Sequence, residues 1–289
     1  MRFHSPLFPL IFCDFVVMFS IMEKAMKDPT TIITLTTDFG IRDGFPAAMH
    51  GVILSINPEV RIVDLCHGIS PGDIAHGAYL LATVTPYFRS GSIHVAVVDP
   101  GVGTPRMILA VKTKDQMYIA PDNGLLGYIL ERQPDAEVRY LENADLWLKN
   151  PSSTFHGRDI MAPTAAHLSA GVPFHKVGPI VNTWEPAPFP PAKQTGNMVQ
   201  GRIIHVDHFG NLITNIPGMT SDSLSIGDRR IEQRGLTFQE GKPGEPIVLV
   251  GSSGWLEIAI NGDSAVQVLG VTVGDIVTAQ VGKNSRGDR

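Results

Sequence analysis

Hydrophobic and polar positions repeat with two different periods along this chain, and the period changes near residue 182. In the first part, short apolar runs rich in β-branched residues alternate with longer segments of helical periodicity, which is typical of buried strands and the helices that cover them. The predicted strands are Ile32–Thr37, Arg61–Leu65, Ile93–Val98, Met107–Lys112 and Met117–Ala120, and the predicted helices are Ala47–Ile56, Asp73–Phe88 and Asp159–Ser169. This alternation indicates an α/β fold with a largely parallel sheet covered on both faces.

Prolines interrupt the pattern after Val181. The segment 183–197 holds four prolines and little apolar periodicity, which predicts a stiff, extended linker. Beyond it we expect short strands separated by glycine-rich turns, at Gly201–Val206, Leu212–Ile216, Ile247–Val250, Trp255–Asn261, Gln267–Leu269 and Ile276–Val281. No segment of helical period intervenes, so this part should be a small, mostly antiparallel β-barrel or sandwich.

A length of 289 residues suits two domains of ordinary size. We expect the α/β domain over residues 30–182, the linker over 183–198, the β domain over 199–283 and a tail at 284–289. Residues 1–29 are set apart because their apolar run, Leu7–Met22, is interrupted by Pro9 and Asp14. We interpret them as a leader, a poorly ordered tail or an over-extended translation start, since the run is shorter than the roughly 20 residues that span a bilayer.

Composition narrows the class of protein. Hydrophobic residues make up 43% and charged residues 18%, which excludes a disordered chain. A net charge of −5 provides no overall positive field, so neither nucleic acid nor a membrane surface is an expected partner. Two cysteines cannot form a disulfide framework, and no CxxC pair is present. We therefore expect a cytoplasmic protein.

Two aspartates directly follow apolar strands. Asp38 comes after Ile32–Thr37 and Asp99 after Ile93–Val98, each with a glycine two residues further on. Ligands of open α/β sheets bind beyond the carboxyl ends of the strands, so both carboxylates are expected in one crevice. The alternative for either aspartate alone is that it caps a turn or a helix.

The sequence lacks several common cofactor-binding and catalytic motifs. Gly101-Val102-Gly103 does not begin a dinucleotide fingerprint, because Arg106 stands where the third glycine is required. The chain has no Walker sequence and no GxSxG nucleophile elbow. The histidines at 50, 67, 76 and 94 lack the spacing of metal ligands, so no metal site is expected.

Three polar loops are candidates for ligand contact. His156 stands between Phe155 and Gly157, just before a predicted helix, and residues 207–211 join two strands of the second domain. Residues 121–124 form a turn that opens a helix. For the last two loops turn formation is the simpler interpretation, and for 121–124 we prefer it. Polar loops on both domains predict a site between them.

Five motifs follow one another along the chain: Thr37–Gly40, Val97–Thr104 with Arg106, Pro121–Gly124, Thr154–Asp159, and Asp207 with Phe209–Asn211. In this order, they closely resemble the motifs of the S-adenosyl-L-methionine (SAM) hydrolases (adenosine-forming), also called SAM hydroxide adenosyltransferases. That family is related to the SAM-dependent fluorinase and chlorinase. The resemblance covers about residues 31–281. It implies a Rossmann-like amino-terminal domain, a carboxy-terminal β-barrel, and hydrolysis of SAM to adenosine and L-methionine.

The resemblance also implies which residues act. The family's Asp–Arg–His set, which handles the attacking water, falls on Asp99, Arg106 and His156, and either Asp99 or His156 could accept the proton. No cofactor and no metal are implied, because SAM is the substrate. Family members form homotrimers, with each site between the amino-terminal domain of one subunit and the carboxy-terminal domain of the next. A second copy of the chain is therefore the expected partner.

The ligand contacts follow from the same resemblance. Asp38 matches the carboxylate that engages the ribose hydroxyls, Asp207 the acid near the methionine ammonium, and Asn211 the asparagine on the adenine side. The carboxy-terminal ligand loop contains Ser252, together with Glu257. The halogenases carry an arginine where this chain has Ser253, so the resemblance leaves the contact to the methionine carboxylate open.

The sequence leaves two alternatives to SAM hydrolysis. A SAM-dependent halogenase is the first, but fluorinase-like chains carry tyrosine and serine where this one has His156 and Gly157, as well as an additional loop. The histidine favours water as the nucleophile. A non-catalytic sensor of adenosine or SAM is the second. The complete Asp–Arg–His set argues against it, because a binding module has no use for a group that activates water.

Overall fold

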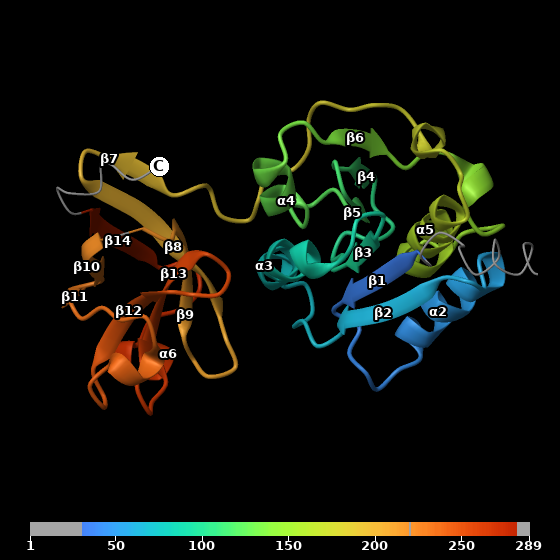
Figure 1. The fold of residues 1–289 in the computed structure, drawn as a ribbon. Helices are drawn as coiled ribbons and strands as arrows, with labels where there is room; N and C mark the ends of the chain where they lie inside the picture. The colour runs from blue at the N-terminus through green and yellow to red at the C-terminus, as the bar shows by residue number, and fades with distance from the viewer. Residues whose placement is uncertain (1–30, 220, 282–289) are drawn as a thin grey trace, which may run out of the picture.

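The computed structural model describes residues 31–219 and 221–281, which form two domains joined by an extended segment (Figure 1). The expected leader at 1–29 and the tail at 284–289 lie outside the described residues. Among the residues described, no helix is long and apolar enough to cross a membrane.

The amino-terminal domain is built on a six-stranded sheet of order β2-β1-β3-β5-β4-β6. Its strands are β1 (Ile32–Thr37), β2 (Arg61–Cys66), β3 (Ile93–Val97), β4 (Ile108–Lys112), β5 (Met117–Pro121) and β6 (Glu137–Tyr140). The pairs β2-β1, β1-β3 and β3-β5 are parallel, whereas β4 is antiparallel to both of its neighbours. The prediction of a largely parallel sheet is confirmed.

Helices cover both faces of this sheet. Helices α2 (Phe45–Ile56) and α5 (Ala162–Ser169) pack together with Ile33, Leu35 and Val95, whereas α3 (Ile74–Val84) and α4 (Gly127–Arg132) pack with Ala96 and Val98. Successive strand residues therefore enter opposite hydrophobic layers, as the pleat of a strand requires. A single π-helical turn, Gly157–Met161, precedes α5.

The carboxy-terminal domain is a nearly closed antiparallel β-barrel of order β11-β10-β14-β8-β9-β13-β12, with β7 paired to β8. Its strands are β7 (Lys193–Thr195), β8 (Met198–Val206), β9 (Leu212–Pro217), β10 (Ser221–Ile226), β11 (Arg229–Ile231), β12 (Pro246–Val250), β13 (Trp255–Ile260) and β14 (Ile276–Val281). An isolated bridge between Arg234 and Val248 joins the two ends of the sheet order. Both the mixed fold class and the barrel are confirmed.

One predicted strand of the barrel is wrong. Residues 267–269 belong to the short helix α6 (Ala265–Leu269), so a helix does occur in this domain. Ala265 and Leu269 are buried four residues apart, which is the helical spacing. Gly270, with a φ of +66°, then ends the helix in the left-handed conformation. A five-residue helix is too short for its period to stand out from the surrounding strands.

The two domains contact each other through α3 and β8. The ring of Tyr79 on α3 stacks on His205 of β8, with 4.3 Å between centroids and an interplanar angle of 18°. On the same side, the Arg132 guanidinium lies 4.5 Å from the ring centroid of Trp255. Barrel residues Ile204 and Ile213 share a hydrophobic cluster with α3 and α4. This contact brings Tyr79 to the edge of the barrel.

Candidate active site

Three residues from separate parts of the amino-terminal domain meet at the carboxyl end of its sheet. Asp99 follows β3, Arg106 precedes β4, and His156 stands directly before the π-helical turn. Arg106 Nε donates to Asp99 Oδ1 at 2.8 Å, and Arg106 Nη2 donates to Asp99 Oδ2. The two side chains are 11% and 4% exposed, so they form a nearly buried, two-pronged ion pair.

His156 joins this pair through the same guanidinium. Arg106 Nη2 lies 2.9 Å from His156 Nδ1, and because arginine has no acceptor, Nδ1 must accept this hydrogen bond. The proton of the neutral ring is then on Nε2. Burial, followed by the charge of Arg106, lowers the pKa of His156, which keeps the ring neutral near pH 7.

The loop between Asp99 and Arg106 is held against the segment before His156. Gly103 has a φ of +79°, and a Cβ there would lie 2.5 Å from the carbonyl oxygen of Ser153, so only glycine fits. On the other side, Asn123 Nδ2 donates to the carbonyl of Val98 at 2.8 Å. The 121–124 turn therefore has the structural role that we preferred for it.

Asp38 lies at the same edge of the sheet. Its backbone N–H donates to the carbonyl of Val97, and its Oδ2 accepts from the N–H of Gly72 at 2.8 Å. The next residue, Phe39, forms an aromatic cluster with Phe45 and Phe155, whose centroids are 5.4–5.7 Å apart. Asp38 and the Asp99 group are thus on neighbouring loops, beside an apolar surface.

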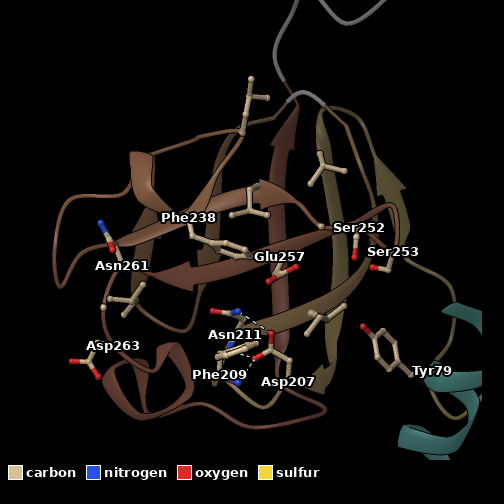
Figure 2. A pocket seen from close by; sticks show the side chains of 17 residues that line it. Tyr79, Asp207, Phe209, Asn211, Phe238, Ser252, Ser253, Glu257, Asn261 and Asp263 are labelled. Atoms are coloured by element: carbon tan, nitrogen blue, oxygen red, sulfur yellow. Dashed lines mark hydrogen bonds between the residues drawn. The ribbon is translucent and has the colours of Figure 1, made fainter. Parts of the chain in front are cut away.

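The candidate residues of the second domain line one pocket of about 760 Å³ in the barrel (Figure 2). They are Asp207, Asn211, Ser252 and Glu257. Asp207 Oδ1 accepts from the N–H groups of Phe209 and Asn211, both at 2.9 Å, and Oδ2 accepts from Asn211 Nδ2 at 2.8 Å. These bonds shape the loop and fix the Asp207 carboxylate at the pocket.

Burial, reinforced by the charge of Asp207, raises the pKa of Glu257 to about 7. Glu257 is 8% exposed, and it is directed into the pocket from β13.

Sequence reasoning missed part of the pocket wall. Tyr79 reaches it from α3 of the amino-terminal domain, and Leu236 and Phe238 reach it from the segment before β12. Nothing in the local pattern distinguishes Tyr79 from its helical neighbours, because its position depends on how the two domains pack. Leu236 and Phe238 lie between two predicted strands. An aromatic residue in such a connecting segment is the signal that could have indicated a ligand contact.

The two groups of candidate residues do not share a pocket within one chain. Among the described residues, those that line the barrel pocket do not include Asp38, Asp99, Arg106 or His156. The structure therefore places the Asp99–Arg106–His156 group on the amino-terminal domain and the other candidate residues in a separate pocket of the barrel. In the described part of the chain, no three His, Cys, Asp or Glu side chains have a geometry suited to a metal ion.

A Rossmann-like domain with a polar Asp–Arg–His group, followed by a β-barrel with an acidic pocket, defines a two-domain class of ligand-binding proteins. Family models place the chain within that class. The N-terminal domain of the SAM hydroxide adenosyltransferases matches residues 33–178, and their C-terminal domain matches residues 201–278. The chain belongs to the SAM hydroxide adenosyltransferase family, which confirms the resemblance.

Individual relatives agree with this membership. The chain is 39% identical to a (R)-S-adenosyl-L-methionine hydrolase from Salinispora tropica over 88% of its own length and 99% of the relative's. It is 30% identical to a fluorinase from Actinoplanes over 80% and 91% of the two lengths. The crystal structure of an uncharacterised conserved protein from Thermotoga maritima superimposes with a TM-score of 0.78 at 36% identity, over 86% of this chain and 99% of that one.

Proposed function

We propose that this protein hydrolyses S-adenosyl-L-methionine to adenosine and L-methionine. The observation that carries the proposal is the convergence of Asp99, Arg106 and His156 at the carboxyl end of the sheet, in a chain of the SAM hydroxide adenosyltransferase family. Relatives named (R)-S-adenosyl-L-methionine hydrolase, at 39% identity, support hydrolysis over halogenation, since the fluorinase is more distant at 30%.

The chemistry requires a nucleophile rather than an acid. Sulfur already carries the positive charge, so the bond from sulfur to the ribose 5′-carbon breaks with its electron pair going to sulfur, and neutral methionine leaves. Water attacks the same carbon in line with that bond and must lose a proton. Orientation and a nearby base are therefore the contributions that the protein can make, and a base accounts for about 10²–10⁴ in rate.

The hydrogen bonds favour Asp99 as that base. His156 Nδ1 is occupied by Arg106, and its Nε2 carries a proton, so the ring can donate to the water oxygen but has no free acceptor. Each Asp99 oxygen accepts one bond from Arg106 and retains a further lone pair. In the proposal Arg106 fixes the carboxylate, His156 holds the water, and Asp99 accepts the proton.

The ligand contacts extend the proposal to the other residues. Asp38 would bind the ribose hydroxyls beside the aromatic cluster. Asp207 would bind the methionine ammonium, and Asn211 would lie near the adenine. The loop of Ser252, together with Glu257, would complete the barrel side of the site. Action in the cytoplasm is part of the same proposal.

We further propose that a complete site forms between copies of the chain in a homotrimer. Support comes from the separation of the catalytic group and the barrel pocket within one chain. Large apolar side chains beside both are also exposed: Ile41 by 87% near Asp38, and Phe209 and Leu236 by 75% and 91% at the pocket. Exposed apolar surface next to polar ligand residues is typical of an interface.

A product assay tests the hydrolysis. Purified protein is incubated with SAM, with and without chloride, and the nucleoside products are separated by chromatography. Adenosine supports the hydrolase, chlorinated adenosine would identify a halogenase, and unchanged SAM with bound ligand would identify a sensor.

Subunit mixing tests the shared site. Asp99→Asn removes the catalytic carboxylate of one domain, and Asp207→Asn removes the ligand carboxylate of the other. If sites form head to tail between copies, trimers assembled at random from equal amounts of the two variants regain roughly a quarter of the wild-type sites. A mixture no more active than either variant alone would place the whole site within one chain.

A further inference from the structure

His67 directly follows β2, in a place where the pairing of the sheet is irregular. β1 and β2 lie side by side (Figure 1), and their register shifts by one residue between Leu35 and Thr36. A shift of this kind re-aims the side chains beyond it. His67 consequently lies on the same side of the sheet as Asp64, three positions earlier, whereas strict alternation would place the two on opposite faces.

The ring of His67 belongs to a chain of hydrogen-bonding groups. Its Nδ1 lies 2.8 Å from Thr37 Oγ1, and its Nε2 lies 3.1 Å from Asp64 Oδ1. An ionised carboxylate cannot donate, so Nε2 carries the ring proton, and in the neutral ring Nδ1 accepts from the Thr37 hydroxyl. The backbone N–H of Phe39 donates to the same Thr37 oxygen at 3.2 Å. Thr37 therefore connects the imidazole to the backbone on the far side of Asp38.

The backbone of the segment that begins at His67 holds the same turn. The carbonyl of His67 accepts from the N–H of Gly40 at 2.8 Å, so His67 contacts both ends of residues 37–40. At the other end of the segment, the N–H of Gly72 donates to Asp38 Oδ2 at 2.8 Å. The second oxygen, Asp38 Oδ1, accepts no hydrogen bond from the part of the chain that the structure describes. Residues 67–72 thus fix the Asp38 carboxylate and leave one oxygen for a ligand.

Burial limits how this chain can act on a ligand. Thr37 is fully buried and His67 is 8% exposed, so both reach a ligand only through Asp38. A buried hydrogen bond of this kind is expensive to break, because it leaves a polar group unsatisfied. At the outer end, His50 Nε2 lies 2.8 Å from Asp64 Oδ1, with side chains 32% and 42% exposed. Solvent competes for that outer contact, so it should contribute little.

We propose that His67 is a positioning residue for Asp38. Through Thr37 and through its own carbonyl, it fixes the turn that carries Asp38, so that the free carboxylate oxygen faces the ribose hydroxyls of the substrate. This inference rests on the proposed function, in which Asp38 binds the ribose. It makes His67 and Thr37 determinants of affinity for a nucleoside that carries these hydroxyls.

Two amide substitutions separate the two ring nitrogens. The amide of asparagine lies where an imidazole has Nδ1, and the amide of glutamine lies where it has Nε2. His67→Asn should therefore keep the contact with Thr37, whereas His67→Gln should lose it. Thr37→Val removes the hydroxyl and retains the branched shape of the side chain. His50→Gln is the matched control, because it changes a histidine at the exposed end of the same chain.

Titration calorimetry of the full-length protein compares adenosine with 2′,3′-dideoxyadenosine, which lacks both ribose hydroxyls. We expect His67→Gln and Thr37→Val each to weaken adenosine binding by about tenfold, since a misplacement of about 1 Å can cost up to about 10²-fold. Binding of dideoxyadenosine should not change, which also reports that the variants are folded. His67→Asn and His50→Gln should bind adenosine within about twofold of the wild type.

A double variant shows whether His67 acts through Asp38. In the Asp38→Ala background, His67→Gln should cause no further loss of adenosine affinity, because the carboxylate that it positions is absent. A role of His67 in general stability would instead add its own loss to that of Asp38→Ala. Thr37→Val in the same background provides an independent repeat of the comparison.

Four results would overturn the inference. They are an equal loss of affinity for both nucleosides, a loss in His67→Asn as large as in His67→Gln, a further loss in the double variant, or wild-type protein that binds adenosine no more tightly than dideoxyadenosine. Adenosine production from SAM by the wild-type protein is measured in parallel. If that reaction is absent while the nucleoside results hold, the proposed hydrolysis fails and the assignment of His67 stands.

Discussion

The ion pair between Arg106 and Asp99 allows a quantitative prediction. Replacing Arg106 with methionine retains most of the side-chain stem and removes the guanidinium. Asp99, with its side chain 4% exposed, would then keep a buried charge without a cation. Removing one partner of a buried pair costs about 3–5 kcal/mol, chiefly because the remaining charge is poorly solvated. In domains of this size each kcal/mol lowers the unfolding temperature by about 2–4 °C, so we expect a fall of about 6–20 °C.

A second substitution identifies the cause. If the stranded charge is responsible, Asp99→Asn in the Arg106→Met background should recover part of the loss, because an unpaired neutral amide costs only about 1–3 kcal/mol. Arg230→Met is the control. Its ion pair with Glu232 has side chains 55% and 71% exposed, so its loss should cost less than about 1 kcal/mol.

Differential scanning calorimetry of the three variants and the wild type measures these effects. The reasoning fails if Arg106→Met unfolds within about 2 °C of the wild type, or if the double variant is no more stable than Arg106→Met alone. Either result would mean that the Asp99 charge is solvated or neutralised without Arg106.

Three further predictions concern activity, binding and pH. Asp99→Asn should lower the turnover of SAM by about 10²–10⁴-fold with little change in adenosine affinity, and an unchanged kcat would remove Asp99 from the mechanism. Asp38→Ala should weaken adenosine binding by about 1.5–3 kcal/mol in calorimetry, since the ribose hydroxyls lose a charged acceptor; wild-type affinity would refute the ribose assignment. Burial lowers the pKa of His94 to about 4, below the 6.5 of the unfolded chain, so the unfolded state binds more protons in acid. Stability should therefore fall by about 3 kcal/mol between pH 6.5 and 4 through this residue. Urea unfolding of His94→Gln should show a shallower fall, and coincident pH profiles for the two proteins would contradict the prediction.

Much of the fold can be predicted from local pattern. The β-branched run of β1 and the apolar run of β3 predict strands buried on both faces, and the strand ends at Asp38 and Asp99 follow from the residues that terminate each run. Local pattern fails for short elements. The four-residue β6 and the five-residue α6 span too few residues for a period to show, and the pairing of neighbouring strands decides their conformation.

The sequence by itself determined the order of the elements, the two-domain division and the types of residue available for chemistry, because these depend on neighbours along the chain. Tertiary structure decided which side chains meet. Arg106 and His156 are 50 positions apart and touch only because the β3–β4 loop packs against the segment before α5. Tyr79 reaches the barrel pocket because α3 packs against β8. Glu257 lines that pocket and is not part of the barrel core, because the pleat of β13 turns its side chain toward the pocket. Contacts of this kind depend on the packing of whole layers, which no local window of sequence contains.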